Sequence, residues 1–257
     1  MVKYAIIGVE GPQDQAIVGK LLKLLGLKKF DGSVSNLDSF WKKFIPTYPK
    51  KGNFYKRLDM PSILFNDSLS VAIYVGEGSN LVKNLDDILS NNSQYKKDIA
   101  AFGIVADADK KNPEDVVAEY HSSFCKYFPN FPNRPGFVDI NIPRTGIYVL
   151  PDNISHGVLD TLLCECGKIA YPEYIERAES YLADLSEEEK KSLKWKPFDR
   201  EKALVATVVS VLKPGKTNTV SIADNNWVSD KTLLEVAALK KLKTFLIELL
   251  EITNTTN

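Results

Sequence analysis

Acidic residues directly follow two of the predicted β-strands. Residues 2–9 form a short apolar run that ends at Glu10, and the apolar run 101–106 continues into Asp107 and Asp109. Because the carboxyl ends of parallel strands meet at one edge of a sheet, we expect these acids to lie close together in space. Carboxylate oxygens are the ligands that a hard divalent cation prefers. The pattern predicts a Mg²⁺ or Mn²⁺ site; in the alternative interpretation, each acid is simply a polar residue that leaves the core at a loop.

The chemistry that such a site supports is hydrolysis of a phosphodiester. A phosphodiester repels nucleophiles, and its cleavage builds negative charge on its oxygens. Bound cations can neutralise that charge and activate a water molecule. A positioned lysine can stabilise the transition state, and Glu10 can move a proton. Metal-dependent hydrolysis of a phosphodiester is therefore the chemistry that these residues favour.

A second region with functional side chains is the segment 41–57, WKKFIPTYPKKGNFYKR, which contains no acid. Its candidate nucleic-acid-binding residues are Trp41, Lys42, Lys43, Lys50, Lys51, Tyr55, Lys56 and Arg57. Lysines on phosphates, with bases stacked on aromatic rings, hold single strands without sequence readout. Alternatively, the rings anchor a loop to the core while the lysines stay solvated, or the segment is a surface for a partner protein.

The elements that must position these residues alternate between strand and helix. After the first strand, Asp14 can cap a helix that ends at Gly26. A second strand covers residues 70–75, and Asn112 with Pro113 begins a helix after the third strand. This alternation over the first 165 residues predicts an α/β fold with a mostly parallel central sheet flanked by helices.

The order of the acids resembles the Toprim domain, which occurs in topoisomerases, primases and the nuclease domains of OLD-type proteins. Glu10, Gly11 and Asp14 match its Glu-Gly-x-x-Asp, and Asp107 with Asp109 match its later Asp-x-Asp. The stretch VAIYVGEGSNLVKNL is similar to the second Toprim strand and its turn. The stretch GIYVLPDNISHGVLDTLL resembles an uncharacterised Toprim-like bacterial family. The resemblance covers roughly residues 2–30 and 70–165 and, more weakly, 200–250. It implies a Toprim-like fold and a divalent-metal-dependent nuclease or related phosphotransfer enzyme that acts on nucleic-acid phosphodiesters.

The resemblance also implies a role for each matching acid. Glu10 would be a metal ligand or a general acid/base near the scissile phosphate. Asp107 and Asp109 would hold Mg²⁺ or Mn²⁺. Asp14 would join a second metal site, as in OLD-like nucleases, or would simply cap its helix. Asp160 falls where the related family usually carries an acid.

Basic residues complete what the resemblance implies. Nuclease members often use a C-terminal basic residue to neutralise the phosphate, and Lys202 and Lys216 are the nearest candidates. Position 111 is Lys, so the third acid of a D-x-D-x-D run is absent, which is closer to the OLD-type arrangement than to a topoisomerase.

OLD-like systems often join Toprim to an ATPase, and no ATPase motif occurs in this sequence, so a separate ATPase partner is conceivable. The competing function is a non-catalytic nucleic-acid or nucleotide-binding module that acts as an effector.

The expected domain organisation is a Toprim-like α/β domain over residues 1–165, with an insertion at about 31–69. A mainly helical C-terminal extension, residues 166–257, would pack on it. The last helix has an apolar face that would serve the core or a homodimer, with Leu242, Phe245, Leu246 and Leu249 on it.

Composition limits the classes of partner. The 33 basic and 33 acidic residues balance, so affinity for nucleic acid must come from a local basic patch. Three cysteines in 257 residues do not suggest a disulfide framework. The first apolar run is too short to span a bilayer. We expect a soluble, cytoplasmic protein that does not contact membranes.

Overall fold

The computed structural model describes residues 2–45, 60–76 and 78–253. Its strands are β1 (Lys3–Val9), β2 (Lys28–Lys29), β3 (Ser62–Phe65), β4 (Leu69–Val75), β5 (Ala101–Asp107), β6 (Val138–Asp139) and β7 (Arg144–Leu150). Its α-helices are α1 (Pro12–Leu24), α2 (Leu81–Asn91), α3 (Ser93–Lys97), α4 (Pro113–Phe124), α5 (Leu159–Ala170), α6 (Pro172–Ala183), α7 (Glu187–Ser192), α8 (Asp199–Leu212), α9 (Asn218–Asp224), α10 (Asp230–Glu235) and α11 (Ala237–Leu250). Short 3₁₀ turns are η1 (Val34–Asn36), η2 (Ser39–Trp41) and η3 (Gly78–Asn80).

The strands form one sheet in the order β2-β3-β4-β1-β5-β7-β6. The four central strands, β4, β1, β5 and β7, run parallel to one another. Towards the edges, β3 is antiparallel to β4, and β6 is antiparallel to β7. The prediction of an α/β fold with a mostly parallel sheet is confirmed.

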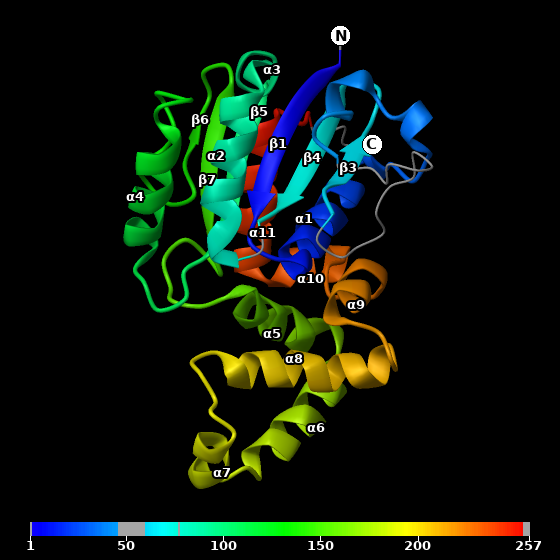
Figure 1. Ribbon diagram of the computed structural model, residues 1–257. Coiled ribbons are helices and arrows are strands. Elements are labelled where there is room, and N and C mark those ends of the chain that lie inside the picture. Colours follow the sequence, from blue (N-terminus) through cyan, green and yellow to red (C-terminus); the bar gives the residue numbers. More distant parts are fainter. Residues whose placement is uncertain (1, 46–59, 77, 254–257) are drawn as a thin grey trace.

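The central strands are apolar on both faces, as a parallel sheet covered on both sides requires. Helices cover both faces (Figure 1). Gly103 of β5 and Gly146 of β7 lie under α11. A Cβ at Gly103 would come within 2.4 Å of Leu249, and one at Gly146 within 2.8 Å of the Phe245 ring. The two glycines therefore let α11 pack closely on the sheet.

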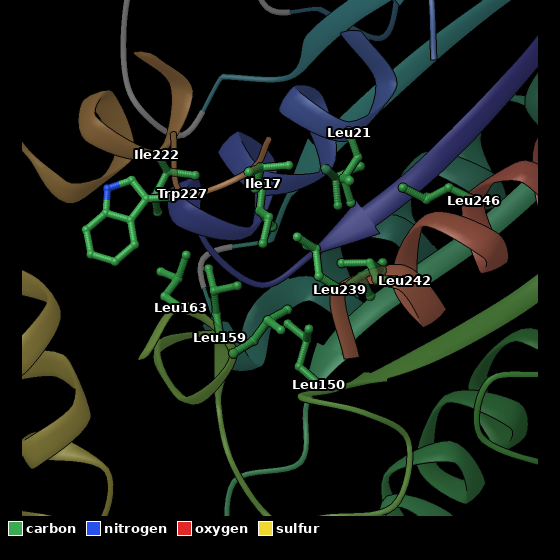
Figure 2. Packing of buried hydrophobic residues seen from close by; sticks show 14 of the residues in the cluster. Ile17, Leu21, Leu150, Leu159, Leu163, Ile222, Trp227, Leu239, Leu242 and Leu246 are labelled. Carbon is green, nitrogen blue, oxygen red and sulfur yellow. The ribbon is translucent and has the colours of Figure 1, made fainter. Parts of the chain in front are cut away.

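The two faces of the sheet have separate hydrophobic cores. α2 and α4 contribute to one core, and α1 and α11 contribute to the other. Figure 2 shows that the second core extends past the sheet, because Trp227, Ile17 of α1, Leu163 of α5 and Leu242 of α11 pack in the same cluster. The apolar face of α11 is buried in this core, so it is used within the chain and not for a dimer.

The helices α5, α6, α7 and α8 lie beyond the carboxyl ends of the parallel strands (Figure 1). The expected domain boundary between residues 165 and 166 is wrong, because it falls inside α5. The last helix, α11, returns to cover β5 and β7 and so belongs to the α/β layers. The segment 31–69 also contributes to the sheet, since β3 pairs with β4.

Within the described ranges, no helix combines the length and the apolarity that crossing a membrane requires.

Candidate acidic site

The carboxyl edge of the sheet collects acids from four elements. Glu10 directly follows β1, Asp14 lies in the first turn of α1, Asp107 ends β5, and Asp160 lies in the first turn of α5. In the sheet, β1 lies between β4 on one side and β5 on the other, so the order of the strands reverses at β1. Ligands bind at such a point of reversal in open α/β sheets. The fold therefore brings together residues that are up to 150 positions apart in the sequence.

Glu10 bridges the ends of β1 and β5. Its Oε1 accepts hydrogen bonds from the Asp107 backbone N–H at 3.3 Å and, at a long 3.4 Å, from the hydroxyl of Tyr120 on α4. Burial is the main reason that the pKa of Glu10 rises to about 7, and the charge of Asp109 adds to the rise. The hydrogen bond from the Asp107 backbone N–H lowers the pKa and partly offsets these effects. Glu10 is therefore close to half-protonated near neutral pH.

Asp14 is 6% exposed, and its Oδ2 accepts the backbone N–H of Gly11 at 2.7 Å. Gly11 is the N-cap of α1 and Pro12 is its first residue, so Asp14 closes the first turn instead of occupying the cap position. Burial, and secondly the charge of Glu10, raise the pKa of Asp14. The helix-capping role implied for this residue is thus present in a modified form, and its metal role stays a prediction.

Asp107 connects β5 to the start of α5. Its Oδ1 accepts the backbone N–H of Leu159 at 2.8 Å. Burial, followed by the charges of Asp14 and Glu10, raises its pKa. Two residues on, Asp109 has a φ of 50°, which Asp tolerates better than most residues. Asp109 exchanges backbone hydrogen bonds of 2.8 and 3.0 Å with Gly157, so the loop before α5 is fixed against the end of β5.

Asp160 is also 6% exposed, and its Oδ1 is buried without a hydrogen-bond partner among the residues that the structure describes. Burial raises its pKa to about 6, and the nearby charge of Lys202 on α8 opposes that rise. Lys202 Nζ also lies 3.9 Å from Asp199 Oδ1. The charge of Lys202 therefore acts on one acid of the site, and its role toward a phosphate stays a prediction.

Lys216 is not brought to this group of acids. It lies in the loop between α8 and α9, where its backbone N–H donates to Lys213 O. The helix α8 separates it from Lys202, and the ten helical positions from Lys202 to Leu212 correspond to about 15 Å. The prediction that Lys216 serves the acidic site is therefore not supported by its place in the fold.

The oxygen atoms of these acids are the ligand type that a hard cation prefers, but they are not arranged around one point as the ligands of a bound metal are. All the ligand atoms are carboxylate oxygens, and Asp160 offers a buried oxygen with no other partner among the described residues. Among the described residues, however, no group of three or more His, Cys, Asp or Glu side chains lies in positions that could hold a metal ion. The acids are close enough to raise one another's pKa values, but they do not yet converge on one point. A cation would have to draw them together.

Trp41 does not form a stacking platform. Its side chain is fully buried, and its Nε1 donates to Ser70 Oγ at 2.8 Å. Ser70 lies near the amino end of β4, about 17 Å of strand from the edge that carries Glu10. The Trp41 ring packs in a buried aromatic cluster with Phe40, Phe44 and Tyr95. The prediction that Trp41 binds nucleic acid is wrong, because exposing this ring would break the cluster.

Of the other predicted nucleic-acid-binding residues, Lys42 and Lys43 are exposed next to this cluster. Lys50, Lys51, Tyr55, Lys56 and Arg57 lie outside the described residues.

Two residues near the acids were not singled out from the sequence. Tyr120 lies on the buried face of α4, and its hydroxyl reaches Glu10. His156 is exposed and immediately precedes Gly157, and its Nε2 lies 3.1 Å from Asn112 Oδ1. The histidine in the stretch PDNISHG could have drawn attention to His156. Nothing in the sequence indicated the role of Tyr120.

The fold and this geometry define an α/β protein with an acidic site at the carboxyl edge of its parallel strands, bordered by a helical unit. The chain belongs to the family described as Protein of unknown function (DUF3226), whose model matches residues 4–251. Among solved structures, a hypothetical protein from Pyrococcus horikoshii OT3 is similar, with 17% sequence identity and a TM-score of 0.49. That similarity covers 96% of this chain and 95% of the other. No curated protein matches the chain.

Proposed function

We propose that this protein is a divalent-metal-dependent nuclease, or a closely related phosphotransfer enzyme, with a Toprim-like acidic site. The observation that carries the proposal is the meeting of acids from β1, α1, β5 and α5 at one edge of the sheet. Buried carboxylates that raise one another's pKa values are costly to the fold unless a cation or protons compensate them. Such clusters are characteristic of functional sites.

In this proposal, Glu10, Asp14, Asp107, Asp109 and Asp160 supply the oxygen ligands. Mg²⁺ or Mn²⁺, when bound, would neutralise phosphate charge and lower the pKa of a water molecule. The side chains then have separate tasks. Glu10 is either one of these ligands or the group that moves a proton, and in the metal-free protein burial raises its pKa to about 7. Tyr120 orients Glu10 through its hydroxyl, and Lys202 offsets the charge of Asp160.

A non-catalytic effector is the second candidate, and the burial of the site favours it. Asp14 and Asp160 are each only 6% exposed, and the first residue of α5 donates its backbone N–H to Asp107. A scissile phosphate cannot easily reach acids that are covered in this way, so a module that binds a nucleotide or nucleic acid elsewhere and signals to a partner, such as a separate ATPase, is the alternative.

The experiment that tests these candidates measures cleavage of labelled single- and double-stranded DNA and RNA with Mg²⁺, Mn²⁺ or EDTA. Glu10→Gln and Asp107→Asn are compared with Glu176→Gln and Asp184→Asn, which make the same chemical changes at exposed positions of α6 and its end. We expect metal-dependent cleavage that falls by about 100-fold or more in the first pair, the usual range for an acid–base group, and stays unchanged in the second pair.

Cleavage that persists in EDTA, or that all four variants retain, would contradict the proposed hydrolysis. Binding of nucleic acid without cleavage under any condition would favour the effector.

A further inference from the structure

A narrow cleft is lined by residues of α1, of the strands β2 and β3, and of α9. Its cationic lining consists of Lys20 and Lys23 from α1 and Lys29 from β2. The hydroxyl-bearing residues Ser62 and Thr219 line it as well. Figure 1 shows α1 and α9 side by side in this part of the molecule, and the two helices are in contact. The segments that build this cleft are separated by up to about 200 residues in the sequence.

The charge of this cleft is not compensated by the described part of the protein. The described lining contains no acid, and none of the three lysines forms an ion pair within the described residues. Lys20 Nζ donates to the backbone O of Ala223 at 3.1 Å and keeps further donors free. The neighbouring acid, Asp224, is already paired with Lys213 at 3.1 Å.

The ammonium groups also oppose one another. Lys23 and Lys29 are exposed residues. Partial desolvation of the Lys29 ammonium, and then the charge of Lys23, lower the pKa of Lys29. An anion between the two ammonium groups would pair with both charges at once.

The cleft has room for an anionic group. Its volume is about 90 Å³, and roughly 10–15 Å³ measured in this way is enough to hold one water molecule. A phosphate group can therefore enter it.

The helix α1 connects this cleft to the acidic site. Asp14 lies in its first turn, and Lys20 and Lys23 follow six and nine residues later. At 1.5 Å per residue, these positions lie about 9 and 13.5 Å along the helix axis from Asp14. A nucleic-acid strand in a duplex carries one phosphate per about 3.4 Å of axis. These are separations along the helix axis, so a strand with one phosphate at the acidic edge and another in the cleft would span at least about three to four phosphate spacings.

We propose that the cleft formed by Lys20, Lys23 and Lys29 binds a backbone phosphate of the nucleic-acid strand whose scissile phosphodiester lies at the acidic site. This inference rests on the proposed function for the identity of the strand, while the phosphate chemistry of the cleft stands on its own lining. The cleft supplies the local basic patch that a chain of balanced charge needs in order to bind a polyanion.

The test uses fluorescence anisotropy of short labelled single-stranded and duplex oligonucleotides in EDTA, so that binding is measured without cleavage. The double variant Lys23→Gln/Lys29→Gln removes two charges and leaves Lys20, which holds the end of α9. The matched control is Lys83→Gln/Lys97→Gln, which removes two exposed charges from α2 and α3 on the opposite face of the sheet. Thermal unfolding of both variants checks that they fold.

We expect the cleft variant to bind about tenfold more weakly than the wild type. Its log K should also depend less steeply on log salt, by about 0.7 for each phosphate of a single strand that the variant no longer neutralises. The control variant should bind like the wild type. Equally weakened binding by both double variants, unchanged binding by both, or no binding by the wild-type protein would overturn the proposal.

Two further measurements, cleavage with Mg²⁺ and stabilisation by inorganic phosphate, separate this inference from the proposed function and from another source of phosphate. If the cleft variant loses binding but the wild type never cleaves with Mg²⁺, the cleft stands and the hydrolysis fails. If the wild type cleaves and the cleft variant cleaves and binds equally well, the hydrolysis stands and the cleft fails. If inorganic phosphate raises the melting temperature of the wild type alone and oligonucleotides do not compete with it, the occupant is free phosphate and the nucleic-acid source is overturned.

Discussion

The two ends of the parallel strands bury polar groups in opposite ways. At the amino end, the aromatic cluster of Tyr4, Phe40, Trp41, Phe44 and Tyr95 has a partner for each polar tip. The Tyr4 hydroxyl donates to Asp38 at 2.7 Å, the Trp41 indole to Ser70 at 2.8 Å, and the Tyr95 hydroxyl to Phe40 O at 3.1 Å.

At the carboxyl end, the buried acids face one another, and an oxygen of Asp160 has no partner in the described part of the chain. Satisfied burial stabilises a fold, while burial of like charges costs stability. The aromatic end therefore stabilises the fold, and the acidic end has the unsatisfied buried charge that the proposed function requires. The predictions that follow test this difference.

The largest expected effect is at the aromatic end. Trp41→Ala should lower the free energy of unfolding by about 3–5 kcal/mol, because it removes a fully buried ring and leaves a cavity. Urea denaturation measures this change. Lys43→Ala, at an exposed position nearby, is the control and should change stability by less than about 0.5 kcal/mol. Unchanged stability of Trp41→Ala together with weaker oligonucleotide binding would restore the stacking interpretation.

A smaller effect of opposite sign is expected at the acidic end. The folded-state pKa of Glu10 is about 7, above the ordinary 4.5. The stability contributed by its protonation is fully present below pH 4.5 and is lost as the pH rises through about 7. In metal-free buffer, Glu10→Gln should match the wild type near pH 4 and be more stable at pH 8 by up to about 3 kcal/mol. Urea denaturation across this pH range measures it.

Glu176→Gln on α6 is the matched exposed control for that series, and it should follow the wild type at every pH. If Glu10→Gln were less stable than the wild type at pH 8, the acidic end would be stabilised as it stands, and the contrast with the aromatic end would disappear.

The smallest effect concerns Tyr120. Its hydrogen bond lowers the pKa of Glu10, so Tyr120→Phe should raise that pKa and move the pH-dependent loss of stability to higher pH. The change in stability itself should be near the low end of about 0.5–1.5 kcal/mol, since the bond is long. NMR titration of labelled glutamate carboxyls measures the shift. Tyr181→Phe, at an exposed position, should leave Glu10 unchanged; a downward shift in Tyr120→Phe would remove the orienting role of the hydroxyl.

The elements of this fold were predictable because their signals are local. The apolar runs 2–9, 70–75 and 101–106 became β1, β4 and β5, and the acids begin at the ends of the first and the third. Gly26, at a φ of 90°, follows the end of α1, and Pro113 begins α4, as expected. Ser186 and Glu189 form the capping box at the start of α7. Each of these signals acts within a few residues, so a sequence can be read for them directly.

The candidate site was only partly predictable. That Glu10 and Asp107 would meet followed from a general rule about the carboxyl ends of parallel strands. Nothing local shows that the hydroxyl of Tyr120 reaches Glu10, or that Lys202 rather than Lys216 lies beside an acid. Both depend on how helices pack against the edge of the sheet. The burial of Trp41 depends in the same way on a contact with β4, 29 residues further along the chain.

By itself, the sequence determined the strand ends, the helix starts and the acidic character of one sheet edge, because backbone propensities, caps and apolar periodicity are short-range effects. The tertiary structure alone decided which rings are buried, which lysine meets which acid, and that three lysines from α1 and β2 gather in one cleft whose described lining has no acid. Packing and electrostatic interaction depend on distance in space, and residues far apart in the chain become neighbours only when the layers of the fold close over one another.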